Sequence, residues 1–221
     1  MRPAARVPQC KVISDSQITE ELAPYGVRAN DQLCRRIQDY IQLLLLWNRR
    51  VSLTTVVEPK EIIRFHFGES LFAVEKAAIE NGRLADVGSG AGFPGLPIAM
   101  TVPGLGVTLI EANQKKAAFL SEVIRRLDLR NTMVLRARLS EVTEELGAFD
   151  FITARAVGPH SELIRWSFRF LKPSGRLILW LGEDDATLIR REDGWDWQTM
   201  VRIPGSQRRV LLVGSRRNRS S

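Results

Sequence analysis

The sequence predicts a doubly wound α/β fold, in which a mostly parallel sheet is covered by helices on both faces. Two observations support this prediction. From residue 83 onward, short apolar segments of strand type alternate with longer segments whose apolar residues recur every three or four positions. The 221 residues are 44% hydrophobic and 26% charged, which is enough for one sizeable packed core.

Six strands are expected in the second part of the chain, each an apolar run bounded by turn residues. They cover residues 83–88, 106–112, 132–137, 149–156, 176–182 and 208–215. Helices are expected between them, one beginning at residue 95 and two covering 115–129 and 162–171. The last two strands follow each other closely, so we expect an antiparallel pair at one edge of the sheet.

Two helices are expected before the sheet begins. Residues 31–49 carry apolar side chains at helical spacing behind Asp31, a residue type that caps helix starts. Residues 59–80 begin with Pro59, which the first turn of a helix tolerates. The expected organisation is a disordered segment at 1–15, a helical cap at 16–80, an α/β domain at 81–215 and a basic tail at 216–221.

Composition narrows the classes of function. The net charge of +7 favours a polyanionic partner such as nucleic acid, although charge alone is weak support. Cys10, Cys34, His66 and His160 are the only cysteines and histidines, so neither a disulfide framework nor a metal site is predicted. The longest apolar run, residues 43–47, is far short of a membrane span, and no signal peptide is recognisable. We expect a soluble, cytoplasmic monomer without membrane contact.

A glycine-rich turn is the clearest candidate for a ligand site. Residues 84–100 read LADVGSGAGFPGLPIAM and follow the first strand, at the edge where parallel sheets bind ligands. A phosphate-binding loop would end in Gly-Lys-Ser/Thr, and a dinucleotide fingerprint would have glycine in place of Phe93. The spacing is instead Asp86, Gly88, Gly90 and Gly92, which resembles the D-x-G-x-G-x-G pattern of S-adenosylmethionine-dependent methyltransferases. S-adenosylmethionine is therefore the expected cofactor.

The second strand ends at Glu111, where a carboxylate can accept both ribose hydroxyls of a nucleoside. The alternative is a surface acid that merely ends a strand. Turn and acid together favour the nucleoside pocket. The class pattern thus places four residues at the cofactor: Asp86, Gly88, Gly90 and Glu111.

A closer resemblance runs from about residue 31 to residue 214. The chain carries, in this order, WNRRVSLTTVVEPKEIIRFHFGESL, LADVGSGAGFPGLPIA, EANQKKAAFLSEVIRRLDL, ARLSEV, FITARAVG and RRVLLV. These segments and their order resemble the bacterial small-subunit ribosomal RNA guanine-N7 methyltransferase family, also called the glucose-inhibited division protein B family. The Trp-Asn…Leu-Thr block and the Gly-Phe-Pro-Gly extension are more specific than the class glycines.

This resemblance implies a Rossmann-like class I methyltransferase fold with a seven-stranded sheet. It also implies methyl transfer from S-adenosylmethionine to N7 of a guanine in 16S ribosomal RNA, with the 30S subunit or its precursor as partner. Two alternatives stay open at this point. The chain is either a methyltransferase of another RNA or of a small molecule, or a non-catalytic S-adenosylmethionine-binding protein that interacts with RNA or assists assembly.

The resemblance also implies roles for single residues. Cofactor contacts are implied for Gly88, Phe93, Leu139, Ser140 and Arg155. Arg155, at the end of the fourth strand, is the implied catalytic residue, although an ion pair with Asp150 or another acid also explains it. Arg138 and Arg208 match two arginines that the family places around the substrate RNA.

The chain departs from the usual family pattern at four places. They are Ser52 for Asn, Glu69 for Asp, Leu139-Ser140 for Ala-Glu and Leu181 for Lys. Guanine N7 carries a lone pair and no proton, so its methylation needs no general base. An arginine can orient the base through O6 or a phosphate.

One group of basic residues and one histidine can each be interpreted in more than one way. Lys115, Lys116, Arg125 and Arg126 fit an RNA-facing patch or a solvated helix face equally well. His66 fits a packed helix histidine at least as well as a contact with RNA. RNA binding by such a patch should weaken strongly with salt.

Overall fold

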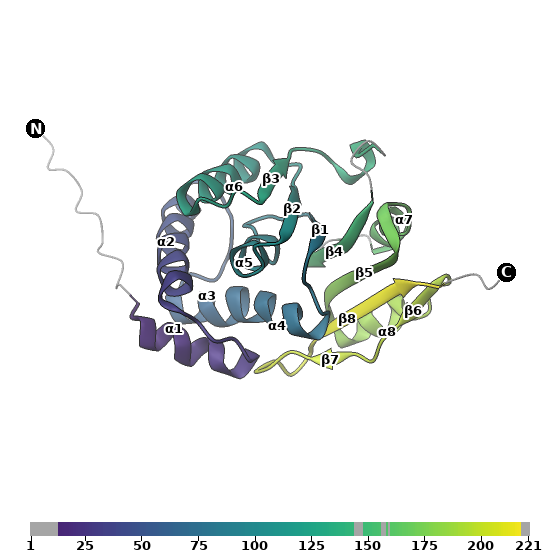
Figure 1. Cartoon of the computed structure of the whole chain (residues 1–221), viewed down its shortest axis with the longest axis horizontal. Coiled ribbons are helices and arrows are strands. Elements are labelled where there is room, and N and C mark those ends of the chain that lie inside the picture. The colour runs from purple at the N-terminus through teal and green to yellow at the C-terminus, as the bar shows by residue number, and fades with distance from the viewer. Residues whose placement is uncertain (1–12, 144–147, 156–157, 159, 218–221) are drawn as a thin grey trace, which may run out of the picture.

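The computed structural model describes residues 13–143, 148–155, 158 and 160–217, with one eight-stranded sheet surrounded by helices (Figure 1). The strands are β1 Gly82–Val87, β2 Leu105–Ile110, β3 Thr132–Leu135, β4 Phe149–Arg155, β5 Leu171–Gly182, β6 Trp195–Trp197, β7 Val201–Arg202 and β8 Arg209–Arg216. The helical elements are α1 Asp15–Leu22, η1 Ala23–Tyr25, α2 Asp31–Asn48, α3 Pro59–Ile62, η2 Ile63–Gly68, α4 Glu69–Lys76, α5 Gly95–Thr101, α6 Gln114–Leu127, η3 Leu139–Glu141, α7 His160–Phe170 and α8 Glu183–Ile189.

The strand order places the glycine-rich turn where ligands bind. The order is β3-β2-β1-β4-β5-β8-β6, with β7 paired to β8 beside this path. Strands β1 to β5 are parallel, and β8 pairs antiparallel with β5, as expected for the last two predicted strands. Because β1 lies between β2 and β4, the chain order reverses at β1. Sheets of this kind bind ligands outside the strand carboxyl ends at such a switch point.

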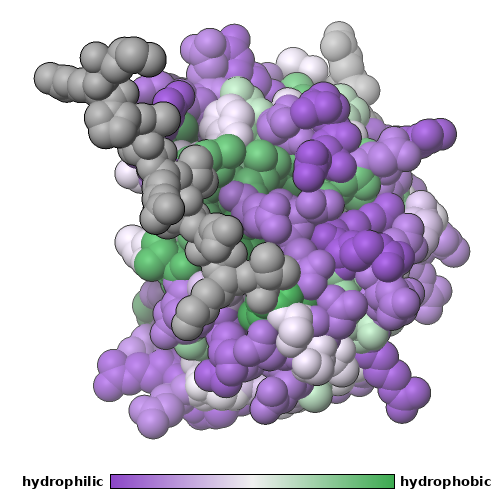
Figure 2. Space-filling model, turned by 90° about the vertical axis from the view of Figure 1, so that its left-hand side faces the viewer, coloured by the Kyte–Doolittle hydropathy of each residue, from purple (hydrophilic) through white to green (hydrophobic). Residues whose placement is uncertain are grey.

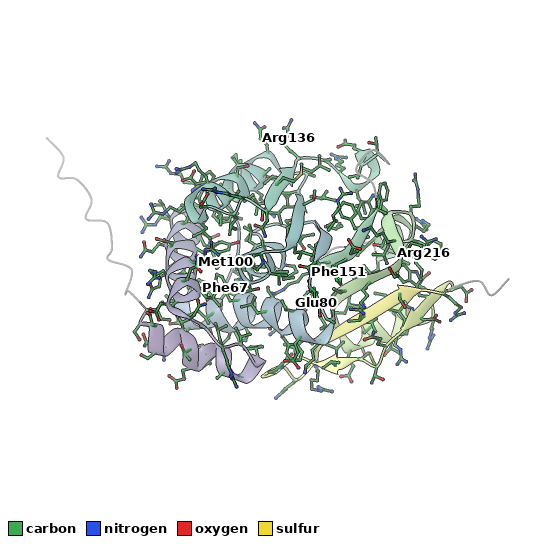
Figure 3. All side chains as sticks on the ribbon, viewed as in Figure 1. Phe67, Glu80, Met100, Arg136, Phe151 and Arg216 are labelled. Atoms are coloured by element: carbon green, nitrogen blue, oxygen red, sulfur yellow. The ribbon has the colours of Figure 1, made fainter. Side chains whose placement is uncertain are left out.

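The two faces of the sheet have separate apolar cores, which confirms the doubly wound fold. Leu84 and Ile178 pack in a core with the N-terminal helices, α5 and α6. Their neighbours Ala85 and Leu179 point to the other face and pack with α7 and α8. Successive side chains of a strand point to opposite faces, which explains this division. Figure 3 shows Phe67 in the interior of the first core and Arg136 at the periphery.

The helix expected over 59–80 consists of three pieces. It begins at Pro59 as predicted, widens into the π-helical η2, and ends with α4 at Lys76. Gly68, at the end of η2, packs against the ring of Tyr25, and a Cβ atom at this position would collide with that ring. The absence of a side chain at Gly68 therefore lets η1 lie directly against the helix.

Several short elements were not predicted. Helix α1 is capped by Ser14 and Gln17 in a capping box, a local signal that the sequence does carry. Strands β6 and β7 have three and two residues, too few to show an alternating pattern. Seven strands form the main path, as expected, and β7 is the additional one. Of the segments expected to be irregular, residues 1–12 and 218–221 lie outside the described residues.

Figure 2 shows the face that carries α1 and α2, where hydrophilic side chains predominate and apolar side chains form smaller groups. Leu46, on α2, is one of the large apolar residues that remain exposed, at 56%. Within the part of the chain that the structure describes, no helix has the length and apolar character needed to cross a membrane.

Candidate functional site

The turn after β1 requires glycine at three positions. Gly88, Gly90 and Gly92 have φ angles of +66°, +57° and +90°, a region that residues with a side chain rarely adopt. A Cβ atom on Gly92 would also collide with the hydroxyl group of Tyr40 from α2. That hydroxyl donates a hydrogen bond of 2.6 Å to the carbonyl oxygen of Ala91. Helix α2 therefore helps to hold the turn in shape.

Asp86 supports the turn from beneath. Its carboxylate is fully buried and accepts hydrogen bonds from Thr153 Oγ1 at 2.8 Å and from the Gly95 amide at 3.3 Å. Burial raises the pKa of Asp86 to about 6, against the lowering effect of these hydrogen bonds. Asp86 was predicted as a cofactor contact, yet it is not among the residues that line the three hollows described below. Its place is that of a residue that positions the turn.

The first hollow, of about 470 Å³, lies beside the ends of β1 and β2, and we call it the Glu111 hollow. Its lining includes Gly88, Glu111, Arg138, Leu139 and Ser140. Glu111 Oε2 accepts a hydrogen bond of 2.8 Å from the Gly90 amide, and Oε1 accepts one of 2.7 Å from the Asn113 amide. A carboxylate has about four lone-pair positions, so each oxygen can accept one more hydrogen bond.

The second hollow, of about 230 Å³, lies on the other side of the turn, and we call it the His66 hollow. Its lining includes Thr54, His66, Gly88, Phe93, Lys116 and Arg155. The His66 ring stacks on Phe93 with centroids 4.6 Å apart, and its Nε2 lies 2.9 Å from Thr54 Oγ1. Burial and the nearby Arg155 charge lower the pKa of His66 to about 4, so the ring is neutral at pH 7.

The third hollow, of about 320 Å³, lies at the ends of β4 and β5, and we call it the Glu69 hollow. The Glu69 side chain is 1% exposed and lies between two arginines, 3.3 Å from Arg155 Nη2 and 2.7 Å from Arg209 Nη2. Burial raises the pKa of the Glu69 carboxyl group, and the two guanidinium groups oppose that rise. Burial lowers the pKa of Arg155. The two arginines thus share one buried counter-ion.

The three hollows are adjacent at the carboxyl edge of the sheet. Gly88 lines both the Glu111 and the His66 hollow, and Arg155 lines both the His66 and the Glu69 hollow. A nucleoside beside Glu111 can therefore reach across the turn toward Arg155. This arrangement fits a nucleoside cofactor whose reactive end meets a second substrate.

Comparison with known proteins identifies the family. Residues 33–199 match the family model described as rRNA small subunit methyltransferase G, over more than half of the chain. The chain belongs to this family. The protein named ribosomal RNA small subunit methyltransferase G from Xanthomonas oryzae is 37% identical over 182 residues, which are 79% of this chain and 83% of the relative. The protein of that name from Stenotrophomonas maltophilia is 39% identical over 204 residues, 89% and 92% of the two chains.

Solved structures agree on the fold. The crystal structure of precorrin-6y C5,15-methyltransferase from Geobacter metallireducens has a TM-score of 0.55 at 18% identity. The match covers 67% of this chain and 87% of that chain. The class I methyltransferase fold that the family resemblance implied is therefore confirmed.

Arg209 and its neighbour Arg208 have different surroundings in this methyltransferase. Arg208 was predicted as a substrate contact; its side chain is exposed and lines none of the three hollows, and its contact with RNA stays a prediction. Arg209 reaches Glu69 and lies over the ring of Phe65, 5.2 Å from its centroid. Successive side chains along an extended chain point to opposite faces, so the two arginines lie in different surroundings.

Other residues at the site were not predicted as contacts or were left open. Two interpretations were open for Arg155, a residue at the site or a partner in an ion pair. Arg155 lines the His66 hollow, and it also pairs with an acid, which is Glu69 rather than Asp150. Lys116 lines the His66 hollow, whereas Arg125 and Arg126 pair with acids on the surface. Thr54 belongs to the Leu-Thr block that resembles the family, but it was not predicted as a site residue; the structure places its hydroxyl group 2.9 Å from His66 Nε2.

Proposed function

We propose that this methyltransferase transfers a methyl group from S-adenosylmethionine to N7 of a guanine in 16S ribosomal RNA. The observation that carries the proposal is the arrangement of the three hollows at the switch point of the sheet. Gly88 lines both the Glu111 and the His66 hollow, and Arg155 lines both the His66 and the Glu69 hollow. These adjacent hollows offer a place for a nucleoside cofactor and a place for an acceptor base. The names of the relatives support ribosomal RNA of the small subunit as the substrate.

The residues around the turn fit S-adenosylmethionine. A Cβ atom on Gly90 would meet only the carbonyl oxygen of Gly88, at 3.7 Å, so the space above the turn is open to a ligand. Glu111 lies where a carboxylate accepts ribose hydroxyls, and Leu139 and Ser140 line the same hollow, as adenine contacts would. The bound cofactor supplies an electrophilic methyl group on a sulfonium ion.

Methylation of guanine N7 requires the protein to position the two reactants and does not require it to transfer a proton. Holding two reactants in the right geometry lowers a barrier by about 7–11 kcal/mol in well-oriented systems. Arg155 borders both the His66 and the Glu69 hollow, and its Nη1 is buried without a hydrogen-bond partner among the described residues. We assign this donor to O6 of the guanine or to a phosphate, which makes Arg155 the catalytic residue. The neutral His66 adds no charge beside the sulfonium.

The net charge of +7 supports an RNA partner, whose binding should weaken as salt rises. The proposal includes the assembled 30S subunit or its precursor as the substrate particle, a monomeric enzyme, and a cytoplasmic location. Arg138 lines the Glu111 hollow and is exposed, so it can contact RNA at the edge of the cofactor site.

The test is a transfer assay with S-adenosylmethionine that carries a labelled methyl group. The protein is incubated separately with 30S subunits, with naked 16S ribosomal RNA and with bulk transfer RNA, and labelled nucleotides are then identified. We expect N7-methylguanine in 16S ribosomal RNA. Label in another RNA would contradict the substrate, and cofactor binding without any transfer would favour a non-catalytic role.

A further inference from the structure

The Glu69 hollow contains a second carboxylate, from Asp185 on α8, whose surroundings differ from those of Glu69. Asp185 is exposed, and no hydrogen bond or ion pair joins its side chain to another residue in the described part of the chain. A Cβ atom built on Gly182 would lie 3.8 Å from Asp185 Oδ2, so this oxygen lies over the backbone at the end of β5. Its hydrogen-bonding capacity is therefore free on the side of the hollow.

The other acids nearby are already engaged. Glu69 is held between Arg155 and Arg209, and Glu183, two residues before Asp185, lies 3.2 Å from Arg202. Glu69 is also buried, so Asp185 is the exposed carboxylate among the described residues that line the hollow, and it can accept hydrogen bonds from a ligand.

The hollow also offers a donor and apolar walls. Arg155 contributes the buried Nη1 that has no hydrogen-bond partner among the described residues. Leu163, Leu179 and Leu181 supply apolar surface. Sites for heteroaromatic ligands combine these features: mostly apolar walls with a few polar groups that set the orientation. A flat base fits such a site, where the lining offers one acceptor, Asp185, and one donor, Arg155.

We propose that Asp185 selects guanine by accepting hydrogen bonds from its N1–H and its exocyclic amino group. Arg155 donates to O6 of the same base. Adenine presents no donor at N1, so it cannot satisfy the carboxylate in this way. A base held by its Watson–Crick edge keeps N7 free on the opposite ring, where the methyl group must arrive. This inference rests on the proposed function and names the residue that sets its base specificity.

The target base must leave its stack to enter the hollow. Enzymes that modify a base take it out of the helix or act on unpaired nucleotides, and they read the Watson–Crick edge that is exposed in this way. A bidentate contact of a side chain with a base edge discriminates against the wrong base by about ten- to a hundredfold. Asp185 is exposed to water, so we expect the lower end of this range.

The experiment compares guanine with inosine, which lacks only the exocyclic amino group. Wild type, Asp185→Asn and the matched control Asp184→Asn are assayed on 30S subunits reconstituted with either base at the mapped target position. We expect wild type and Asp184→Asn to prefer guanine by about tenfold in kcat/KM. Asp185→Asn should lose about tenfold on guanine and show a guanine-to-inosine ratio near one, with unchanged affinity for S-adenosylmethionine.

The outcomes separate the two proposals. A wild-type enzyme that labels no guanine at N7 contradicts the proposed function itself. A wild type that labels guanine while Asp185→Asn keeps the wild-type ratio, or a wild type without preference over inosine, overturns the role of Asp185 alone. Thermal unfolding of both variants shows that they are folded, as expected for exposed side chains.

Discussion

Glu69 Oε2 lies 3.3 Å from Arg155 Nη2, in a contact that joins the start of α4 to the end of β4. Glu69 also pairs with Arg209 at 2.7 Å, from the start of β8. One buried carboxylate thus orients two arginines that come from distant parts of the chain. The carboxylate neutralises their mutual repulsion, and it leaves Nη1 of Arg155 without a partner among the described residues.

Glu69→Gln should weaken both activity and stability. Glutamine keeps the shape but leaves two guanidinium groups without their counter-ion, so we expect kcat/KM to fall at least about tenfold. Removing one partner of a buried pair costs about 3–5 kcal/mol, and the partial exposure of both arginines reduces this to about 1–3 kcal/mol. Urea unfolding and the transfer assay measure the two effects. Glu122→Gln, in an exposed pair with Arg125, is the control and should change neither.

Arg155→Ala should abolish methyl transfer while leaving the fold intact. The substitution removes the donor that we assign to the acceptor base, whereas Glu69 keeps Arg209 as a partner. Transfer of labelled methyl groups measures activity, and circular dichroism reports the fold. Arg190→Ala, at an exposed position after α8, is the matched control. Wild-type activity in Arg155→Ala would show that the reacting groups meet elsewhere.

Arg209→Ala and Arg208→Ala test the assignment of the two neighbouring arginines. Arg209 pairs with the buried Glu69, so its loss should lower kcat/KM by about tenfold or more. The exposed Arg208 lines none of the three hollows, so its loss should matter far less. Steady-state kinetics on the same ribosomal substrate compare the variants. The reverse order of effects would restore Arg208 to the site.

Gly88→Val should prevent cofactor binding. Gly88 has a φ of +66°, and a β-branched residue there costs about 1–3 kcal/mol in strain and fills the turn. Gly205→Val is the matched control, because Gly205 has a φ of +73° and open space around its Cβ position. Both variants should lose similar stability. Only Gly88→Val should lose its affinity for S-adenosylmethionine, which isothermal titration calorimetry measures. Equal cofactor affinity in the two variants would place the cofactor away from the turn.

Asp86 should make the protein more stable as the pH falls. Its pKa is about 6 in the folded chain and 3.8 ordinarily, so between these values the folded state binds a proton that the unfolded state has lost. This raised pKa favours folding at low pH, and the benefit is lost as the pH rises through 6. The free energy of unfolding of wild type, relative to that of Asp86→Asn, should therefore rise by up to about 3 kcal/mol as the pH falls from 7 to 4. A constant difference across this range would contradict the assigned pKa.

Local patterns were sufficient to predict much of the fold. The alternation of strands and helices predicted the layers, and the spacing of Asp86, Gly88 and Gly90 predicted the turn. Glu111 lies beside the turn, as its position at the end of a strand implied, and its contact with ribose hydroxyls stays a prediction. These features depend on neighbouring residues or on the common edge of a parallel sheet, so they can be read without the structure. Helix α8 and the short strands β6 and β7 carry too few residues to be read in this way.

The sequence by itself determined the class of fold and the placement of the glycine turn beside Glu111, because each follows from local geometry and from strand order. Only the tertiary structure decided that Glu69 pairs with both Arg155 and Arg209, and that Asp185 stays unpaired among the described residues of the same hollow. The physical reason is distance along the chain. Packing the N-terminal helices against the sheet brings these groups together, and burial then decides which charges are neutralised and which remain free to bind.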